Sequence, residues 1–547
     1  MFGRLHIMGG VRALCFALIA FLALGWSRPA AAQDTWQGTV NSSWSVAGNW
    51  DKGVPTGATP IIIPNGTPLV LGDTSITNRQ QLSIGTTGTG STAELDIAST
   101  TTITNTGPDG GINNAGVLNN AGAVILQVGT SLDQEATMTN SGLLQIDAGA
   151  DITNYGAQFE NAASGTLTDN GSFIGKVGNV IDNYGAITTG VGATFSSAGT
   201  LENHAGSSIV SYGNLENAVL LSNDTGASLT TYGELDNDKN LVNGGSFEIK
   251  SGGLLFSGFG TVDNSGTFQN DAGGAITNYG TIVNDPGATF TNNGAYLGKG
   301  GSQILNFGNF TVGSTGSDFE NAGSISNDGI VKIVAGATLN NAVDASYLQT
   351  SGHTIVDGTM NSATPVQIFG GTLSGTGNIV GGLLNGSLAA VSSGTVQPGD
   401  NGEPGTLVVT GYEQESGATF DELIGSSGNG LLVAVGGGIQ LDDGALLDID
   451  LLDGFTPTDG EQFDIMAAIL ITGEFANAPT TGFEMDGFDW TIEYDPGEIV
   501  LDAVGPASGG GGGGGTTTPE PSGVLLLAMG VAALGFASQR KRAAAAA

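Results

Sequence analysis

The chain has almost no cysteine and few basic residues, and each shortage excludes a class of protein. Its single cysteine, Cys15, lies in the first apolar segment, so the rest of the chain has none. Disulfide bridges, cysteine nucleophiles and cysteine-ligated metals are therefore excluded for the body of the protein. Between Gln33 and Thr518, seven lysine and arginine side chains stand against fifty acidic ones. Nucleic-acid binding needs a basic surface, so we expect no nucleic-acid partner.

Residue patterns typical of catalytic and metal sites are also missing. The body has two histidines, His204 and His353, and each follows or lies in a turn-forming sequence, where a solvated surface residue is expected. Without cysteine or a His-x-x-Glu-His spacing, a zinc site is not expected. The sequence has no G-x-S-x-G elbow, no EF-hand loop and no calcium-binding nonapeptide pattern. We therefore predict no catalytic residue, no cofactor and no metal ligand.

Glycine and asparagine, by contrast, are abundant and recur at regular intervals. Glycine makes up 94 of the 547 residues, and Asn-x-Gly returns every 14 residues from Asn264 to Asn306. The unit Asn278–Thr291 holds two short alternating segments, each ended by an Asn/Gly turn, which predicts strands with one apolar residue, such as Phe290, pointing inward. No such unit could bury its apolar face alone, so the units are expected to stack.

A parallel β-helix satisfies this pattern, and we predict an all-β, elongated solenoid. Each coil would contain three strand-and-turn segments and about 21 residues. Asparagines could stack at the corners with their amides hydrogen-bonded along the axis, and the less regular stretch 212–250 would carry longer loops. A β-propeller is the main rival, but it needs units of about 40 residues, which are not seen.

The two ends of the predicted stack have sequences of their own. Residues 33–100 form a tryptophan-containing cap module, in which Trp36, Trp44, Asn49 and Trp50 precede the first apolar strand. The tryptophans are expected to cap the first coil; a platform of exposed rings for carbohydrate stacking is the other interpretation. The repeats occupy residues 101–430, and the alternating stretch 431–505 predicts a small antiparallel β cap.

This repeat style resembles the passenger domains of autotransporters. The resemblance rests on the tryptophan pattern at the start and on the glycine-rich segments 371–381 and 398–407 near the end. It implies a β-helix and says little about function. The sequence after the repeats does not predict an outer-membrane barrel, so we do not expect an autotransporter in the strict sense.

The N-terminal segment, residues 1–32, reads as a secretory signal peptide. Arg4 and Arg12 precede an apolar run, and a row of small alanines then offers a cleavage site between Ala32 and Gln33.

The C-terminal segment has the composition of a membrane-held tail. A Gly/Thr linker, residues 506–518, leads to Pro519, Glu520 and Pro521, and an apolar stretch follows. We predict a single transmembrane helix there. The basic cluster Arg540, Lys541 and Arg542 would stop it on the cytoplasmic side.

Residues 519–542 resemble the PEP-CTERM sorting signal of Gram-negative bacteria. In that family the signal is read by exosortase, a membrane transpeptidase-like enzyme, and such tails usually end at the basic cluster, whereas this chain continues to Ala547. The resemblance implies an inner-membrane precursor that is passed to the envelope, the surface or the extracellular polymer. The expected function is structural or adhesin-like and non-catalytic, with an exopolysaccharide or cell-envelope glycan as a further partner.

A carbohydrate-active β-helix enzyme, either a polysaccharide lyase or a hydrolase, is the alternative. Paired acids such as Asp448 and Asp450 could serve a glycosidase, although solvated strand faces also account for them. Lyases of this architecture neutralise a substrate carboxylate with clustered basic residues, and the body has only scattered ones. A cleft of converging acids and cations that interrupts the stack would distinguish the enzyme from the structural protein.

Overall fold

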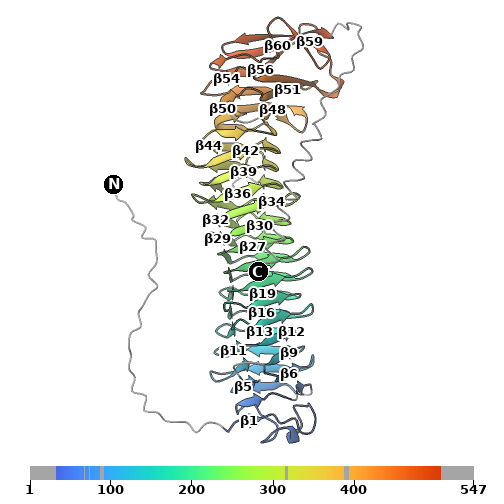
Figure 1. The fold of residues 1–547 in the computed structure, drawn as a ribbon, viewed down its shortest axis with the longest axis vertical. Coiled ribbons are helices and arrows are strands. Elements are labelled where there is room, and N and C mark those ends of the chain that lie inside the picture. Colours follow the sequence, from blue (N-terminus) through green and yellow to red (C-terminus); the bar gives the residue numbers. More distant parts are fainter. Residues whose placement is uncertain are drawn as a thin grey trace, which may run out of the picture.

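Short parallel strands wind into a single elongated rod (Figure 1). The computed structural model describes residues 32–66, 68–72, 74–86, 91–313, 318–386 and 393–506. These residues form a β-solenoid of about 17 coils. The helical elements of this part of the chain are two single turns, η1 (Ala47–Asn49) and η2 (Leu452–Gly454). The prediction of an all-β parallel β-helix is confirmed.

Each coil contains three four-residue strands, as β20 (Thr194–Ser197), β21 (Thr200–Asn203) and β22 (Ser208–Ser211) show. From β2 (Ile61–Ile63) to β44 (Thr359–Ser362), each strand pairs in parallel with the strand three positions later, so β21 pairs with β24 (Leu220–Asn223). The rod therefore has three columns of strands, which we call the first, second and third columns after β20, β21 and β22. In most coils equivalent residues lie 20 to 22 positions apart, for example Asn203 and Asn223, which agrees with the predicted coil of about 21 residues.

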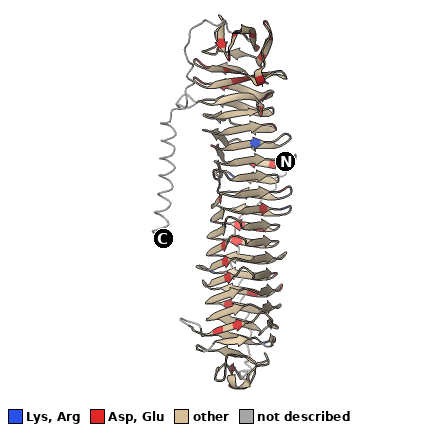
Figure 2. Cartoon of the chain, turned by 90° about the vertical axis from the view of Figure 1, so that its right-hand side faces the viewer, with Lys and Arg blue, Asp and Glu red and all other residues tan. Residues whose placement is uncertain are grey.

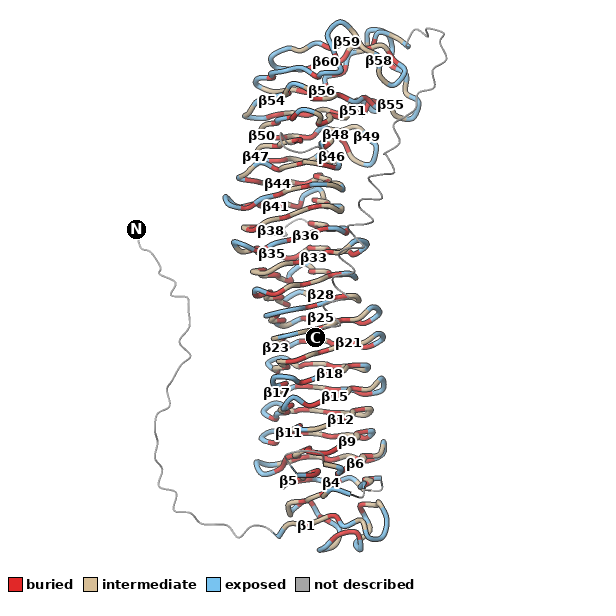
Figure 3. The backbone as a smooth tube through the Cα atoms, viewed as in Figure 1, coloured by how far each residue is buried: buried red, intermediate tan, exposed pale blue. Residues whose placement is uncertain are grey.

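The core is a continuous apolar column inside the rod, because alternate residues of each strand point inward. In β34 (Thr289–Asn292), Phe290 is fully buried and Thr289 is not, as predicted. The Phe290 ring stacks between Phe268 at 4.6 Å and Phe310 at 4.8 Å on the adjoining coils. Figure 3 shows the same buried positions returning in coil after coil.

Buried asparagines form a second, polar column inside the rod. Each is the last residue of a second-column strand, and all but the final one donate from Nδ2 to Oδ1 of the equivalent asparagine on the next coil, at 2.7 to 2.8 Å. The final one, Asn327, donates to Gln349 Oε1 at 3.3 Å. This confirms the predicted asparagine stacking, because a buried amide must find partners within the protein. We call this column the Asn ladder; it comprises Asn120, Asn140, Asn161, Asn183, Asn203, Asn223, Asn243, Asn264, Asn284, Asn306 and Asn327.

Breaking the Asn ladder in the middle should destabilise the rod measurably. In Asn223→Leu, Asn243 Oδ1 loses its 2.7 Å donor, whereas Asn203 keeps the Ser228 carbonyl as an acceptor. The Ser246 carbonyl also loses its 3.0 Å bond from Asn223, and the loss of both bonds should lower the free energy of unfolding by about 2 kcal/mol. Urea unfolding followed by circular dichroism measures this loss. An Asn223→Leu variant as stable as the parent protein would show that the ladder contributes little.

The expectation of longer loops between Tyr212 and Lys250 is wrong. Strands β23 (Asn214–Asn217) to β28 (Ser246–Ile249) follow one another with the ordinary short turns. The sequence is less regular there because outward residues vary freely, while the inward leucines and asparagines are kept.

The N-terminal tryptophans lie inside the rod and close its first coil. Trp44 packs against Trp50 with ring centroids 4.8 Å apart, Trp36 packs against Trp50 at 5.1 Å, and all three are buried. Asn49 is also buried, and its side chain holds the loop through Val40 N and the Ser43 carbonyl. The cap interpretation therefore fits these residues, whereas a platform of exposed tryptophans does not.

The C-terminal cap is shorter than predicted. Strands β53 (Leu431–Ala434) and β55 (Leu446–Leu451) still pair in parallel with the preceding coil. Antiparallel pairing of the final cap joins β56 (Gln462–Ala468) to β60 (Glu498–Pro506) and β60 to β59 (Phe488–Asp495). Alternating apolar and polar residues from Leu431 onward suggested an antiparallel cap. A half-buried parallel strand has the same alternation, so the sequence could not distinguish the two kinds of pairing.

The predicted signal peptide up to residue 31, most of the Gly/Thr linker and the predicted transmembrane helix with its sorting motif lie outside the described residues. Among the described residues, no helix has the length and apolar character needed to cross a membrane.

Candidate functional site

The outer surface of the rod is acidic, and two of its few basic residues, Lys250 and Lys332, each lie between two carboxylates. Figure 2 shows acidic residues along most of the rod, with basic residues scarce in that view. Lys250 Nζ lies 2.8 Å from Glu248 and 3.1 Å from Asp271. Lys332 Nζ lies 3.1 Å from Asp357 and 3.3 Å from Asp400. Other acidic side chains gather in clusters that contain no lysine or arginine, and two of these clusters are candidates for a functional site.

One such cluster surrounds His204, which begins the turn after β21. The turn runs from His204 to Ser207 and is closed by the bond from Ser207 N to the His204 carbonyl at 3.0 Å. Gly206 adopts a φ of 84°, the left-handed conformation that glycine accepts without strain. The parallel register stacks the same turn position on three coils, which places Tyr184, His204 and Asp224 in a row.

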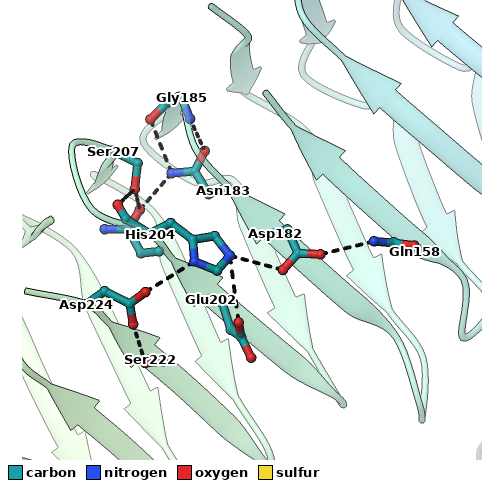
Figure 4. A network of polar contacts seen from close by, with 10 residues as sticks. Gln158, Asp182, Asn183, Gly185, Glu202, His204, Ser207, Ser222 and Asp224 are labelled. Carbon is teal, nitrogen blue, oxygen red and sulfur yellow. Dashed lines mark hydrogen bonds and ion pairs between the residues drawn. The ribbon is translucent and has the colours of Figure 1, made fainter. Parts of the chain in front are cut away.

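Both ring nitrogens of His204 are held by carboxylates (Figure 4). Nδ1 lies 3.2 Å from Asp224 Oδ2, and Nε2 lies 3.1 Å from Asp182 Oδ1 and 3.7 Å from Glu202 Oε2. Asp182, on β18 (Val180–Asn183), and Glu202, on β21, are register partners on neighbouring coils. The cluster of Asp182, Glu202, His204 and Asp224, which we call the His204 cluster, therefore joins three coils.

Further contacts fix the members of the His204 cluster. The Tyr184 ring stacks on the imidazole with centroids 4.1 Å apart and planes 9° from parallel. Ser222 Oγ donates to Asp224 Oδ1 at 3.0 Å, and Gln158 Nε2 donates to Asp182 Oδ2 at 3.3 Å. The His204 side chain is 19% exposed and that of Asp182 15% exposed, so neither is freely solvated.

The electrostatics of the cluster favour positive charge. Partial burial lowers the pKa of His204, but the hydrogen bonds that the imidazole donates to Asp182 and Asp224 outweigh it, so the pKa is raised above its usual value. Even with a protonated imidazole, three carboxylates leave the cluster with excess negative charge.

The arrangement does not resemble a nucleophilic catalytic site. Both ring nitrogens are engaged by carboxylates, and Ser207 Oγ donates to Asn203 and to the His204 carbonyl instead. A histidine that activates a nucleophile needs a hydroxyl or thiol within hydrogen-bonding reach. The residues present are suited instead to holding a cation.

The sequence prediction that His204 is a solvated turn residue was therefore wrong. His204 was expected to be solvated, but the period of 20 to 22 residues brings acids from neighbouring coils to it. Counting by that period from His204 would have identified Tyr184 and Asp224.

His353 is also not a free turn residue, because its Nε2 lies 2.8 Å from Ser374 Oγ. Of the predicted cleavage pair, Ala32 is exposed and Gln33 directly precedes β1 (Asp34–Thr35).

A second acidic group, Glu413, Glu415 and Asp442, lies near the C-terminal cap. Burial, together with Asp442 and Glu413, raises the pKa of Glu415. Next to the group is a hollow of about 480 Å³ whose lining includes Tyr412 and Glu413 but no lysine or arginine. The group contains only carboxyls, with no imidazole. It is a weaker candidate than the His204 cluster.

Searches against protein-family models and against curated proteins found no match for this chain.

Proposed function

We propose that the protein is an exported, exosortase-sorted structural or adhesin-like component of the cell surface or extracellular matrix. The observation that carries this proposal is the regularity of the rod: coil follows coil from β20 to β44 (Thr359–Ser362) with short turns, and long loops that would build a cleft do not intervene among the described residues. A rigid, acidic rod is suited to spanning distance and presenting surface. Its partners would be an exosortase-type enzyme and an exopolysaccharide or cell-envelope glycan.

The enzyme alternative is less well supported by the same surface. Polysaccharide lyases and hydrolases need acids and cations that converge in a cleft. The hollow beside Glu413 contains no basic residue, while Lys250 and Lys332 are paired with acids on other parts of the rod.

The sorting part of the proposal depends on Pro519, Glu520 and Pro521 and can be tested in a host that has exosortase. Replacing the three residues by alanine should leave membrane insertion intact, because the apolar stretch and the basic cluster drive it. Processing should stop, since a receptor-read signal depends on its motif. Full-length protein should accumulate in the inner membrane and disappear from the surface fraction.

A matched control replaces the adjacent residues 516–518 by alanine and should be processed normally. Mass spectrometry of the recovered proteins reads both ends, and the mature N-terminus should be Gln33. If the variant with alanine in place of Pro519, Glu520 and Pro521 is still trimmed and exported, the segment is an ordinary membrane anchor and not a sorting signal.

A further inference from the structure

The His204 cluster combines one imidazole nitrogen and two carboxylate oxygens around a single point. One possible ligand atom from each of Asp182, Glu202 and His204 lies within 4.8 Å of the other two. Imidazole and carboxylate together suit borderline divalent cations such as Zn²⁺, whereas Mg²⁺ and Ca²⁺ prefer ligand sets made only of oxygen.

The distances fit such an ion. Ligands about 2.1 Å from a tetrahedral Zn²⁺ lie about 3.4 Å from each other. His204 Nε2 lies 3.1 Å from Asp182 Oδ1 and 3.7 Å from Glu202 Oε2, which bracket that spacing. Small side-chain movements would therefore admit the ion, and the Glu202 side chain, 39% exposed, is free enough to make them.

The surroundings of the ring are those of a metal-bound histidine. Such a histidine usually donates its other N–H to a carboxylate, which fixes the tautomer and orients the ring. Here Asp224 Oδ2 accepts from Nδ1 at 3.2 Å, and Ser222 Oγ holds Asp224 at 3.0 Å. The stacked Tyr184 ring fixes the imidazole plane. These contacts leave Nε2 directed toward Asp182 and Glu202 (Figure 4).

We propose that the His204 cluster binds one divalent transition-metal ion of the Zn²⁺ type. Asp182, Glu202 and His204 are its ligands, and Asp224 is the positioning residue that orients His204. On binding, the neutral imidazole coordinates through Nε2 and keeps its Nδ1 proton on Asp224, and any second ring proton is released to solvent. Three protein ligands leave a coordination position open toward water. The ion would balance the excess negative charge of the cluster and join neighbouring coils, and the proposal does not depend on export or sorting.

The test uses the full-length protein, purified without a polyhistidine tag, in excess Mg²⁺ to occupy weak carboxylate sites. Titration with Zn²⁺ against a chromophoric chelator should show one tight site. His204→Ala should weaken that site about 100-fold, and Asp224→Ala should weaken it about 10-fold. The matched control, His353→Ala, should bind as the parent does. Electron paramagnetic resonance of the Cu²⁺-loaded protein should show nitrogen coupling that only the His204 variant loses.

Glu202→Gln keeps the test decisive if His204→Ala does not fold, because Glu202 is partly exposed and its replacement should weaken the site while preserving the circular dichroism spectrum. Equal Zn²⁺ affinity in the parent, His204→Ala and Glu202→Gln proteins would overturn the proposal. The cluster would then be an imidazolium held by three carboxylates and nothing more.

Discussion

Replacing Phe290 by aspartate is expected to lower the free energy of unfolding by at least about 4 kcal/mol. Loss of a fully buried phenylalanine alone costs about 3–5 kcal/mol. The new carboxylate would also lie between the Phe268 and Phe310 rings, where no cation can pair with it. Urea unfolding monitored by far-ultraviolet circular dichroism measures the effect. Hydrogen exchange should locate it in the coils around β34, since solenoid coils depend chiefly on their neighbours.

Thr289→Asp is the matched control for this substitution. Thr289 precedes Phe290 in β34 and points outward, so its replacement adds a solvated charge and should change the stability by less than about 1 kcal/mol. If the two variants unfolded at the same urea concentration, the assignment of inward and outward faces in β34 would be contradicted.

The rod is expected to be most stable in mildly acidic solution and to become less stable as the pH rises from about 4 to about 8. Burial raises the pKa of Asp169 to about 7 and those of Asp421 and Asp236 to about 6. It also raises the pKa of the fully buried Glu422 well above its usual value. These carboxyls bind protons more tightly in the folded chain than in the unfolded chain. Their contribution to the stability of the fold is therefore complete below about pH 4, and it is lost as the pH rises through their pKa values in the folded chain.

Asp169 provides the sharpest test of this pH dependence. It is the last residue of β16 (Thr166–Asp169), a third-column position where Asn270 and Asn292 stand in other coils. Asp169→Asn should raise the free energy of unfolding by about 2 kcal/mol at pH 8 and leave it nearly unchanged at pH 4. Asp459→Asn, at an exposed turn, is the control and should leave the free energy of unfolding nearly unchanged at both pH values. Equal effects of Asp169→Asn at both pH values would show that Asp169 does not titrate on unfolding.

The fold was predictable because it depends on inward residues that the chain repeats. Phe290 and the Asn ladder show this directly: the spacing of glycine, asparagine and apolar residues indicated strands, short turns and a coil of about 21 residues, and the structure confirms all three. The end of the stack was less predictable. Leu446–Leu451 alternates as any half-buried strand does, and alternation alone does not tell a parallel partner from an antiparallel one.

The His204 cluster was not predicted because its members are distant in the sequence and outward-facing. Asp182, Glu202 and Asp224 are three acids among fifty, and no short motif joins them to His204. Their proximity depends on register, and a single-residue shift in the pairing of β18 with β21 would turn Asp182 inward. The Asn ladder fixes the register of β18 and β21, because Asn183 and Asn203 must lie side by side for their amides to form a hydrogen bond.

The two caps give the rod a definite length. An open coil at either end would present unpaired backbone to which another molecule could add strands. The buried tryptophans and the antiparallel strands β59 and β60 instead close the ends with structures that no further coil can continue. With strands about 4.8 Å apart, about 17 coils extend for about 80 Å. Removing one whole coil of 20 to 22 residues would shorten the rod by a single strand spacing and leave both ends unchanged.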